Sequence, residues 1–401
     1  MSRRSHPLRS WTAVGGLVLL SSFNVREGTA LTRGPYLGRV SDSAVAVAWD
    51  TDLAGGSRVD FAPEGGGWAT IRQDESTRKH VVVLDGLASG ESYRYRIYSG
   101  EVPLAGESSF RAPRDRREAR FRFAVIGDTS GVDVPLRIAD RLVEADVDFA
   151  LHMGDVVYPS GAEKDYDAQF FTPLARWLSH GPVLPTLGNH DVMTDRGAAY
   201  LANFSLPVND ATGNSRFYAF RHANALFVSL DVESLEFGAE SPQYEWLVRT
   251  LSGSAETWKF VYLHTPPYSS AHANGVARLI LCPLFERYGV DVVLAGHEHL
   301  YERTHPIRAF ASSGPGVIYL TEGGGGANLS QFRQEEFSAY VASRFSYVIA
   351  DVEGSTLTLS AREPDGSMFD SVVVEKSAPN PPRPTPKPPS AKHPPSIVVR
   401  P

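Results

Sequence analysis

The chain has 401 residues, of which 42% are hydrophobic and 21% are charged, and its formal net charge is −7. A chain of this length can bury a large core and form more than one domain. Its acidic excess lies between two basic ends, which argues against nucleic acid as a main partner, because binding to a phosphate backbone needs a basic face.

The beginning of the chain has the pattern of a secretory signal peptide. Three arginines precede an apolar stretch at residues 11–20, which is too short to span a bilayer. Small residues up to Ala30 provide a cleavage site. We therefore predict a signal peptide over residues 1–30, a secreted or periplasmic protein, and no membrane span. The alternative is an uncleaved anchor, or an apolar segment that arose by chance.

Residues 31–115 have the pattern of an all-β domain. Its clearest strand alternates apolar side chains with arginines from Tyr93 to Ile97, so one face is buried and the other is charged. The turn that leads into Tyr93 resembles the tyrosine corner of a fibronectin type III sandwich. We predict a structural β-sandwich of this kind. Binding of carbohydrate or of a surface is the alternative, since this fold serves many functions.

A highly charged segment, residues 112–120, follows this domain and contains four arginines. We predict that it is a solvated linker. Three histidines, His80, His180 and His222, lie in no recognisable motif, and we predict that they are ordinary surface residues.

One construction occurs five times in residues 118–376: an apolar run, typical of a buried strand, is followed by a polar residue that can bind a metal. The apolar runs are residues 121–126, 147–153, 182–187, 258–263 and 290–295. The polar groups that follow them are, in order, Asp128; Asp155 with Tyr158; Asn189 with His190; His264; and His297 with His299. Ligands bind outside the carboxyl ends of the strands in open α/β sheets, so we expect a site at this edge.

The last of these groups favours two metals over one. His297 and His299 are two residues apart in a tight turn after a glycine, so their imidazoles can point at neighbouring centres. Taken alone, such a turn is equally compatible with two solvated histidines. Its four upstream counterparts favour the metal interpretation.

Other segments of the same region predict the elements between these strands. Residues 134–145 are amphipathic and can form the crossover helix between the first two strands. Trp246, Leu247 and Leu251 are spaced as on one face of a helix. Residues 216–230 predict an antiparallel hairpin that turns at residues 222–224.

The chain contains one cysteine, Cys282, so an intrachain disulfide is excluded. It lies in an apolar stretch, and we predict a small buried side chain. An intermolecular disulfide is the alternative, and it would require an exposed thiol. Residues 377–401 contain ten prolines and no acidic residue, which predicts a disordered basic tail.

The ordered motifs resemble those of the calcineurin-like metallophosphoesterase superfamily. They are Gly127-Asp128, Gly154-Asp155-x-x-Tyr158, Gly188-Asn189-His190-Asp191, His264, and Gly296-His297-x-His299. Tyr158 and the run from His299 to Arg303 point within it to the purple acid phosphatases. One departure is visible, because the family's first motif usually reads Gly-Asp-x-Gly, whereas Thr129 and Ser130 follow Asp128 here. The resemblance implies a four-layer α/β/β/α sandwich after the all-β sandwich domain.

The resemblance also implies a centre of two metal ions. One ion would take Asp128, Asp155, Tyr158 and His299, and the other would take Asp155, Asn189, His264 and His297. Asp155 would then bridge the two ions, which lie about 3.5–4 Å apart in two-metal sites. The phenolate of Tyr158 implies Fe(III) at its site, and the other ion would be Fe, Zn or Mn.

Two further histidines are predicted to act on the substrate. His190, next to Asn189, would hydrogen-bond the phosphate or protonate the leaving group. His272, eight residues after His264, lies in a loop similar to those that carry phosphate-binding histidines in the family. A surface histidine is the alternative for His272. His152 flanks a motif, and we predict that it either orients the ligands or has a structural role.

Together these observations predict a secreted phosphomonoesterase of the acid phosphatase type, which hydrolyses small phosphate esters by attack of a metal-bridging hydroxide. A phosphodiesterase with the same metal site is the first alternative. A non-catalytic surface-binding protein is the second, and the altered loop after Asp128 is the feature that favours it.

Overall fold

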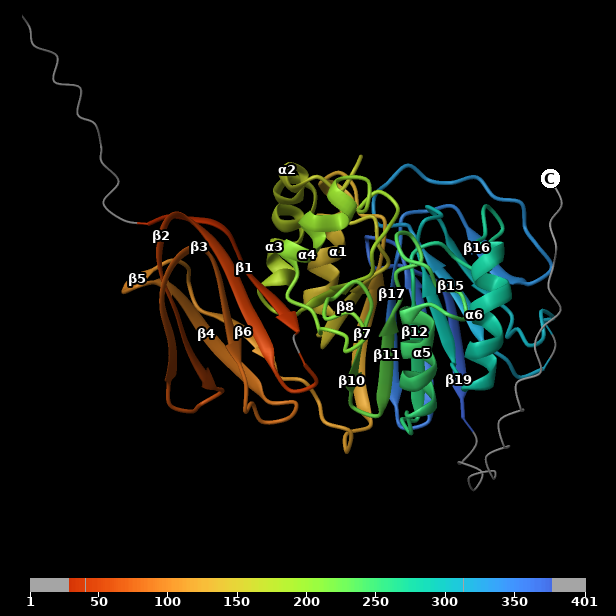
Figure 1. Cartoon of the computed structure of the whole chain (residues 1–401), viewed down its shortest axis with the longest axis horizontal. Helices are drawn as coiled ribbons and strands as arrows, with labels where there is room; N and C mark the ends of the chain where they lie inside the picture. The colour runs from red at the N-terminus through yellow and green to blue at the C-terminus, as the bar shows by residue number, and fades with distance from the viewer. Residues whose placement is uncertain (1–28, 40, 313, 377–401) are drawn as a thin grey trace, which may run out of the picture.

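The computed structural model describes residues 29–39, 41–312 and 314–376 (Figure 1). The predicted signal peptide, apart from its last two residues, and the predicted proline-rich tail lie outside these ranges. Within them, no helix is both long and apolar enough to cross a membrane.

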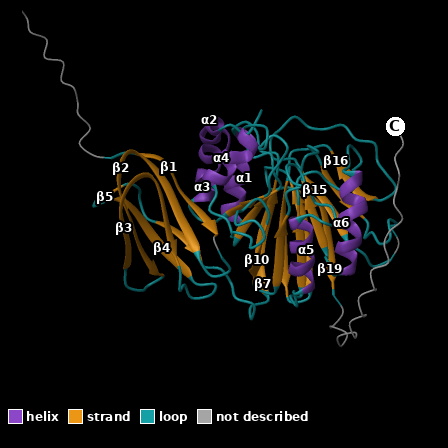
Figure 2. Cartoon of the chain, viewed as in Figure 1, coloured by secondary structure: helices purple, strands orange, loops and turns teal. Residues whose placement is uncertain are grey.

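The N-terminal domain is all-β, as predicted, and its strands pair antiparallel (Figure 2). They are β1 (Leu31–Arg39), β2 (Val45–Pro63), β3 (Ala69–Leu84), β4 (Ser92–Ser99), β5 (Val102–Pro103) and β6 (Ser108–Arg111). The hydroxyl oxygen of Tyr93 accepts a hydrogen bond from the backbone N–H of Ala88 (3.0 Å), which is the contact that defines a tyrosine corner. The apolar side chains of β4 that the alternation predicted are buried.

Two sheets form the core of the second domain. The first has the order β19-β18-β17-β7-β8-β9, and the second has the order β10-β11-β12-β13-β15-β14-β16. The strands of the first sheet are β7 (Arg120–Ile126), β8 (Phe149–His152), β9 (Val183–Pro185), β17 (Tyr347–Glu353), β18 (Thr356–Arg362) and β19 (Met368–Glu375). Those of the second are β10 (Tyr218–His222), β11 (Ala225–Ser229), β12 (Trp258–Tyr262), β13 (Val292–Ala295), β14 (Tyr301–Thr304), β15 (Ile318–Glu322) and β16 (Ser338–Ala342).

The two sheets pack face to face through aromatic side chains. Phe123 of β7 meets Phe227 of β11 and Phe260 of β12 edge-to-face, with ring centroids 5.2 Å apart in both pairs. Helices cover the outer faces (Figure 2). They are α1 (Asp133–Glu144), α2 (Glu163–Tyr166), α3 (Thr172–Leu178), α4 (Ala198–Asn203), α5 (Pro242–Ser252) and α6 (Gly275–Arg287). The predicted four-layer α/β/β/α arrangement is therefore confirmed.

Several local predictions are also confirmed. The amphipathic segment 134–145 forms α1, and the apolar face of residues 246–251 is buried on α5. The segment 216–230 forms the antiparallel pair of β10 and β11. Cys282 lies in α6 and is fully buried, as predicted.

A buried polar network joins the two domains. Arg39 of β1 donates from Nη1 to Nδ1 of His222 (3.0 Å), and Nε2 of His222 donates to Asp148 (3.3 Å). Arg114 donates from Nε to the same carboxylate (3.0 Å). Because a guanidinium only donates, His222 is neutral and carries its proton on Nε2. The prediction of a surface His222 is therefore wrong, and Arg114, in the segment that we predict to be a solvated linker, is half-buried.

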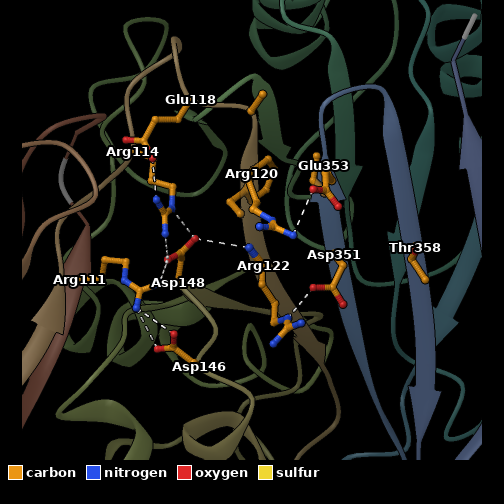
Figure 3. Close-up of a pocket in the computed structure, with 13 residues that line it drawn as sticks. Arg111, Arg114, Glu118, Arg120, Arg122, Asp146, Asp148, Asp351, Glu353 and Thr358 are labelled. Atoms are coloured by element: carbon orange, nitrogen blue, oxygen red, sulfur yellow. Dashed lines mark hydrogen bonds and ion pairs between the residues drawn. The ribbon is translucent and has the colours of Figure 1, made fainter.

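A cleft of about 770 Å³ lies beside this network, at the end of the sheet where β7 and β8 begin (Figure 3). Its charged side chains are paired across it. Arg111 of the N-terminal domain contacts Asp146 (2.8 Å), and Arg122 of β7 contacts Asp351 of β17 (2.6 Å). The cleft is thus lined by ion pairs, of which Arg111–Asp146 joins the two domains and Arg122–Asp351 joins neighbouring strands of one sheet.

His80 is a second histidine whose surface prediction is wrong. Its ring stacks on Trp49, with centroids 4.9 Å apart, inside the N-terminal domain. Both ring nitrogens contact hydroxyl groups, those of Ser57 (2.8 Å) and Thr51 (2.9 Å). His180 is half-buried.

The network makes stability depend on pH. Burial lowers the pKa of His222 to about 4, below the usual 6.5, so the unfolded chain takes up the proton first. Stability is therefore lost as the pH falls from about 6.5 to about 4. His222→Gln keeps an acceptor for Arg39 and a donor for Asp148 but cannot take up a proton. We expect the wild type to lose up to about 3 kcal/mol relative to this variant across that range, as measured by urea unfolding at pH 4.5, 5.5 and 7. Parallel losses in both proteins would contradict this role of His222.

Candidate metal centre

The polar residues that follow the five predicted strands meet at one edge of the two sheets. They follow the carboxyl ends of β7, β8, β9, β12 and β13. Parallel pairing of β8 with β7 and β9, and of β12 with β13, brings these ends together in each sheet. The face-to-face packing of the sheets then brings the two sets of side chains into one site.

One half of the site is formed by Asp128, Tyr158 and His299. The hydroxyl group of Tyr158 lies 3.2 Å from Oδ1 of Asp128 and 3.1 Å from Nε2 of His299. Burial, together with Asp128, raises the pKa of Tyr158 well above its usual range, so a cation that binds the phenolate must displace this proton.

The other half is formed by Asn189, His264 and His297. Oδ1 of Asn189 lies 3.0 Å from Nε2 of His264 and 2.9 Å from Nδ1 of His297. The two ring nitrogens are 3.3 Å apart. Three donor atoms of this kind on one centre suit a borderline cation that accepts both nitrogen and oxygen ligands.

Asp155 lies between the halves. Its Oδ1 is 3.5 Å from Nε2 of His264, and ligand atoms of Asp128, Asp155 and His264 all lie within 4.8 Å of one another. Burial alone would raise the pKa of Asp155, but His264 holds it well below its usual range. In the described part of the chain, the two carboxylates form ion pairs only with histidines.

This charge arrangement fits a metal centre. Asp128 is fully buried and Asp155 is 1% exposed, and burying two neighbouring carboxylates is costly unless cations compensate them. The donors are carboxylate, phenol, amide and imidazole groups, which are ligands of hard and borderline cations. The residues therefore fit the two ions that the sequence motifs imply.

The backbone holds three of the candidate ligands at positive φ angles. Asp128, Asp155 and His297 adopt positive φ angles of 55°, 51° and 70°, which non-glycine residues rarely adopt away from functional sites. The backbone N–H of His297 donates to Oδ2 of Asp128 (3.0 Å), and that of His190 donates to Oδ1 of Asp155 (2.8 Å). These contacts link the loop after β13 to the loop after β7, and the loop after β9 to the loop after β8.

Further groups orient the ligands. Nδ1 of His264 donates to the carbonyl of Met153 (2.7 Å), and Nδ1 of His299 donates to that of Asn328 (2.6 Å), so both rings present Nε2 to the site. Asp191 accepts from the N–H groups of Val156 (3.0 Å) and Gly188 (2.9 Å). Sequence reasoning left Asp191 without a role, although its place directly after His190 was a usable signal.

The loop after Asp128, which departs from the family's first motif, is held by contacts of Thr129. The hydroxyl group of Thr129 contacts Nε2 of His152 (2.9 Å) and donates to the carbonyl of Val156 (3.2 Å). Burial lowers the pKa of His152 to about 3, so this histidine stays neutral. His152 supports the loop, which agrees with a structural role.

The two predicted substrate histidines differ in their surroundings. His190 is at the site, because its Nε2 lies 3.8 Å from Oδ2 of Asp155 and its ring packs on Tyr158. Its Nδ1 donates to the carbonyl of Pro159 (2.5 Å). The side chain of His272 is 87% exposed, and its Nδ1 lies 3.1 Å from Oε1 of Glu298, the residue between His297 and His299.

Comparisons with known proteins found similar sequences. Residues 121–301 match the family model of the calcineurin-like phosphoesterases. The phosphoenolpyruvate phosphatase of Allium cepa is 26% identical over 375 residues, covering 81% of this chain and 76% of that protein. Purple acid phosphatase 21 of Arabidopsis thaliana is 30% identical over 289 residues, covering 65% of this chain and 64% of that protein.

Two solved structures share the fold. The purple acid phosphatase PPD1 from yellow lupin seeds superposes with a TM-score of 0.73 at 20% identity, covering 85% of this chain and 74% of that one. The structure of PhoD superposes with a TM-score of 0.65 at 13% identity, covering 85% and 88%. At these identities the likeness concerns the arrangement of the sheets and helices.

The close approach of two loops gives a test of the site's packing. A Cβ at Gly188 would overlap the backbone of Asp155, whose Cα would lie 2.9 Å away. We expect Gly188→Ala to lower the free energy of unfolding by about 1–3 kcal/mol, since overpacking forces a backbone shift. Gly238→Ala is the matched control, because nothing lies within 4 Å of its Cβ. Equal unfolding midpoints for the two variants in urea would contradict the tight packing.

Proposed function

This chain carries a calcineurin-like metallophosphoesterase domain and is a homologue of the purple acid phosphatases, and from that premise we propose that it is a phosphomonoesterase with two metal ions. The observation that carries the proposal is the convergence of oxygen and nitrogen donors around two buried carboxylates. The pattern of residues 1–30 adds the proposal that the enzyme acts outside the cytoplasm.

We assign each half of the site to one ion. The proposed ligands are Asp128, Asp155, Tyr158 and His299 for the first ion, and Asp155, Asn189, His264 and His297 for the second. When bound, two such ions generate a nucleophile from water near neutral pH and neutralise the charge of the phosphoryl group. We propose Fe(III) at the Tyr158 half and Fe, Zn or Mn at the other.

The chain's own residues then bind and orient the substrate. Nδ1 of His190 is committed to the carbonyl of Pro159, so Nε2 is the nitrogen that faces the space beside Asp155. From there it can hydrogen-bond a phosphoryl oxygen or pass a proton to the leaving group. His272 is proposed as a second phosphate-binding group.

The choice between monoester and diester can be tested directly. We expect faster release of p-nitrophenol from p-nitrophenyl phosphate than from bis(p-nitrophenyl) phosphate, measured as initial rates of the iron- and zinc-supplemented protein. A monoester has one more free oxygen for the metals and His190, whereas a diester must place a second organic group there. Asp155→Asn is the inactive control, because it weakens a ligand shared by both ions. Faster release from the diester would replace the proposal with a phosphodiesterase.

The proposed iron site has a spectroscopic test. A phenolate on Fe(III) gives the purple colour of the family, so the iron-loaded wild type is expected to absorb visible light. Tyr158→Phe is expected to lose that band, whereas Tyr340→Phe, at a half-buried tyrosine of β16, is expected to keep it. A band that survives in Tyr158→Phe would remove Tyr158 from the ligand set.

A further inference from the structure

The loop that carries His272 is fixed on both sides of this residue. The N–H and hydroxyl groups of Ser270 donate to the buried carboxylate of Glu302 (2.7 and 2.6 Å). The N–H of Asn274 donates to the carbonyl of Pro266 (2.7 Å), and its side chain caps α6. The backbone around His272 is therefore held in place, although its side chain is exposed.

The ring of His272 is held by a residue of the turn that carries two of the proposed metal ligands. Glu298 stands between the proposed ligands His297 and His299, and its side chain is only 5% exposed. Its Oε1 accepts from Nδ1 of His272 at 3.1 Å. Within the described residues, this is the one side-chain hydrogen bond of the Glu298 carboxylate, and a buried carboxylate without a partner would be costly.

We propose that Glu298 is a positioning residue that holds His272 for phosphate binding, an inference that rests on the proposed function. Because Nδ1 is committed to Glu298, Nε2 is the nitrogen left for a phosphoryl oxygen. Contact with both the Glu298 carboxylate and a phosphoryl oxygen uses an N–H group at each ring nitrogen. Glu298 thus couples the turn that carries two metal ligands to the loop that binds the substrate anion.

A double-mutant cycle tests this coupling through the binding of inorganic phosphate to the metal-loaded protein, measured by calorimetry. We expect Glu298→Gln and His272→Ala each to weaken phosphate binding about tenfold, as the loss of a hydrogen bond to a charged group does. We expect the double variant to bind like His272→Ala, because Glu298 acts through that ring. In turnover assays, KM for p-nitrophenyl phosphate should rise by the same factor, with kcat within about twofold.

The controls are Glu336→Gln and His305→Ala, at exposed positions outside the site, and both should bind phosphate like the wild type. Each of three results would overturn the inference: additive losses of affinity in the double variant, wild-type affinity in Glu298→Gln, or loss of a metal ion from Glu298→Gln, as measured by elemental analysis. Failure of the proposed function is distinguishable, because it would appear as a metal-loaded wild type that hydrolyses no phosphate ester.

Discussion

The structure depends on holding two buried carboxylates close together. Asp128 and Asp155 lie at the ends of neighbouring strands of one sheet, and their charged partners in the described chain are histidines from their surroundings. Such an arrangement is unfavourable in a low-dielectric interior unless cations occupy it. The positive φ angles at both residues, and the backbone N–H groups aimed at both carboxylates, show that the loops are built to keep them there.

The packing of the two sheets meets this constraint. Either sheet alone would present only part of the donor set, because β7, β8 and β9 carry the oxygen ligands and β12 and β13 carry the histidines. Aromatic contacts such as Phe123 against Phe260 fix the distance between the sheets. A change in that distance would move His264 relative to Asp155, so the core controls the geometry of the site.

At the other end of the same strands, a buried carboxylate joins the two domains. Burial would raise the pKa of Asp148, but hydrogen bonds from His222 and Arg114 hold this pKa at about 2. Arg39 reaches the same cluster from the N-terminal domain. β8 is therefore flanked by two buried carboxylates, Asp148 before it and Asp155 after it. The first is neutralised by arginines and joins the domains, whereas the second forms ion pairs only with histidines in the described chain. The end of the sheet near Asp148 therefore has a structural role, whereas the end near Asp155 carries the candidate metal centre.

The sequence by itself determined the strands, the order of the motifs and the candidate donor residues, because burial imposes apolar runs and metal binding would require particular residue types at their ends. It also determined α1, α5 and the hairpin of β10 and β11, whose periodicities are local. Only the tertiary structure decided the environment of His222, Arg114 and His80, since their partners are distant in the chain or bound through side chains that no pattern reveals. The same holds for the contact of Glu298 with His272: these residues are 26 positions apart and meet only because β13 and the loop before α6 reach the same edge.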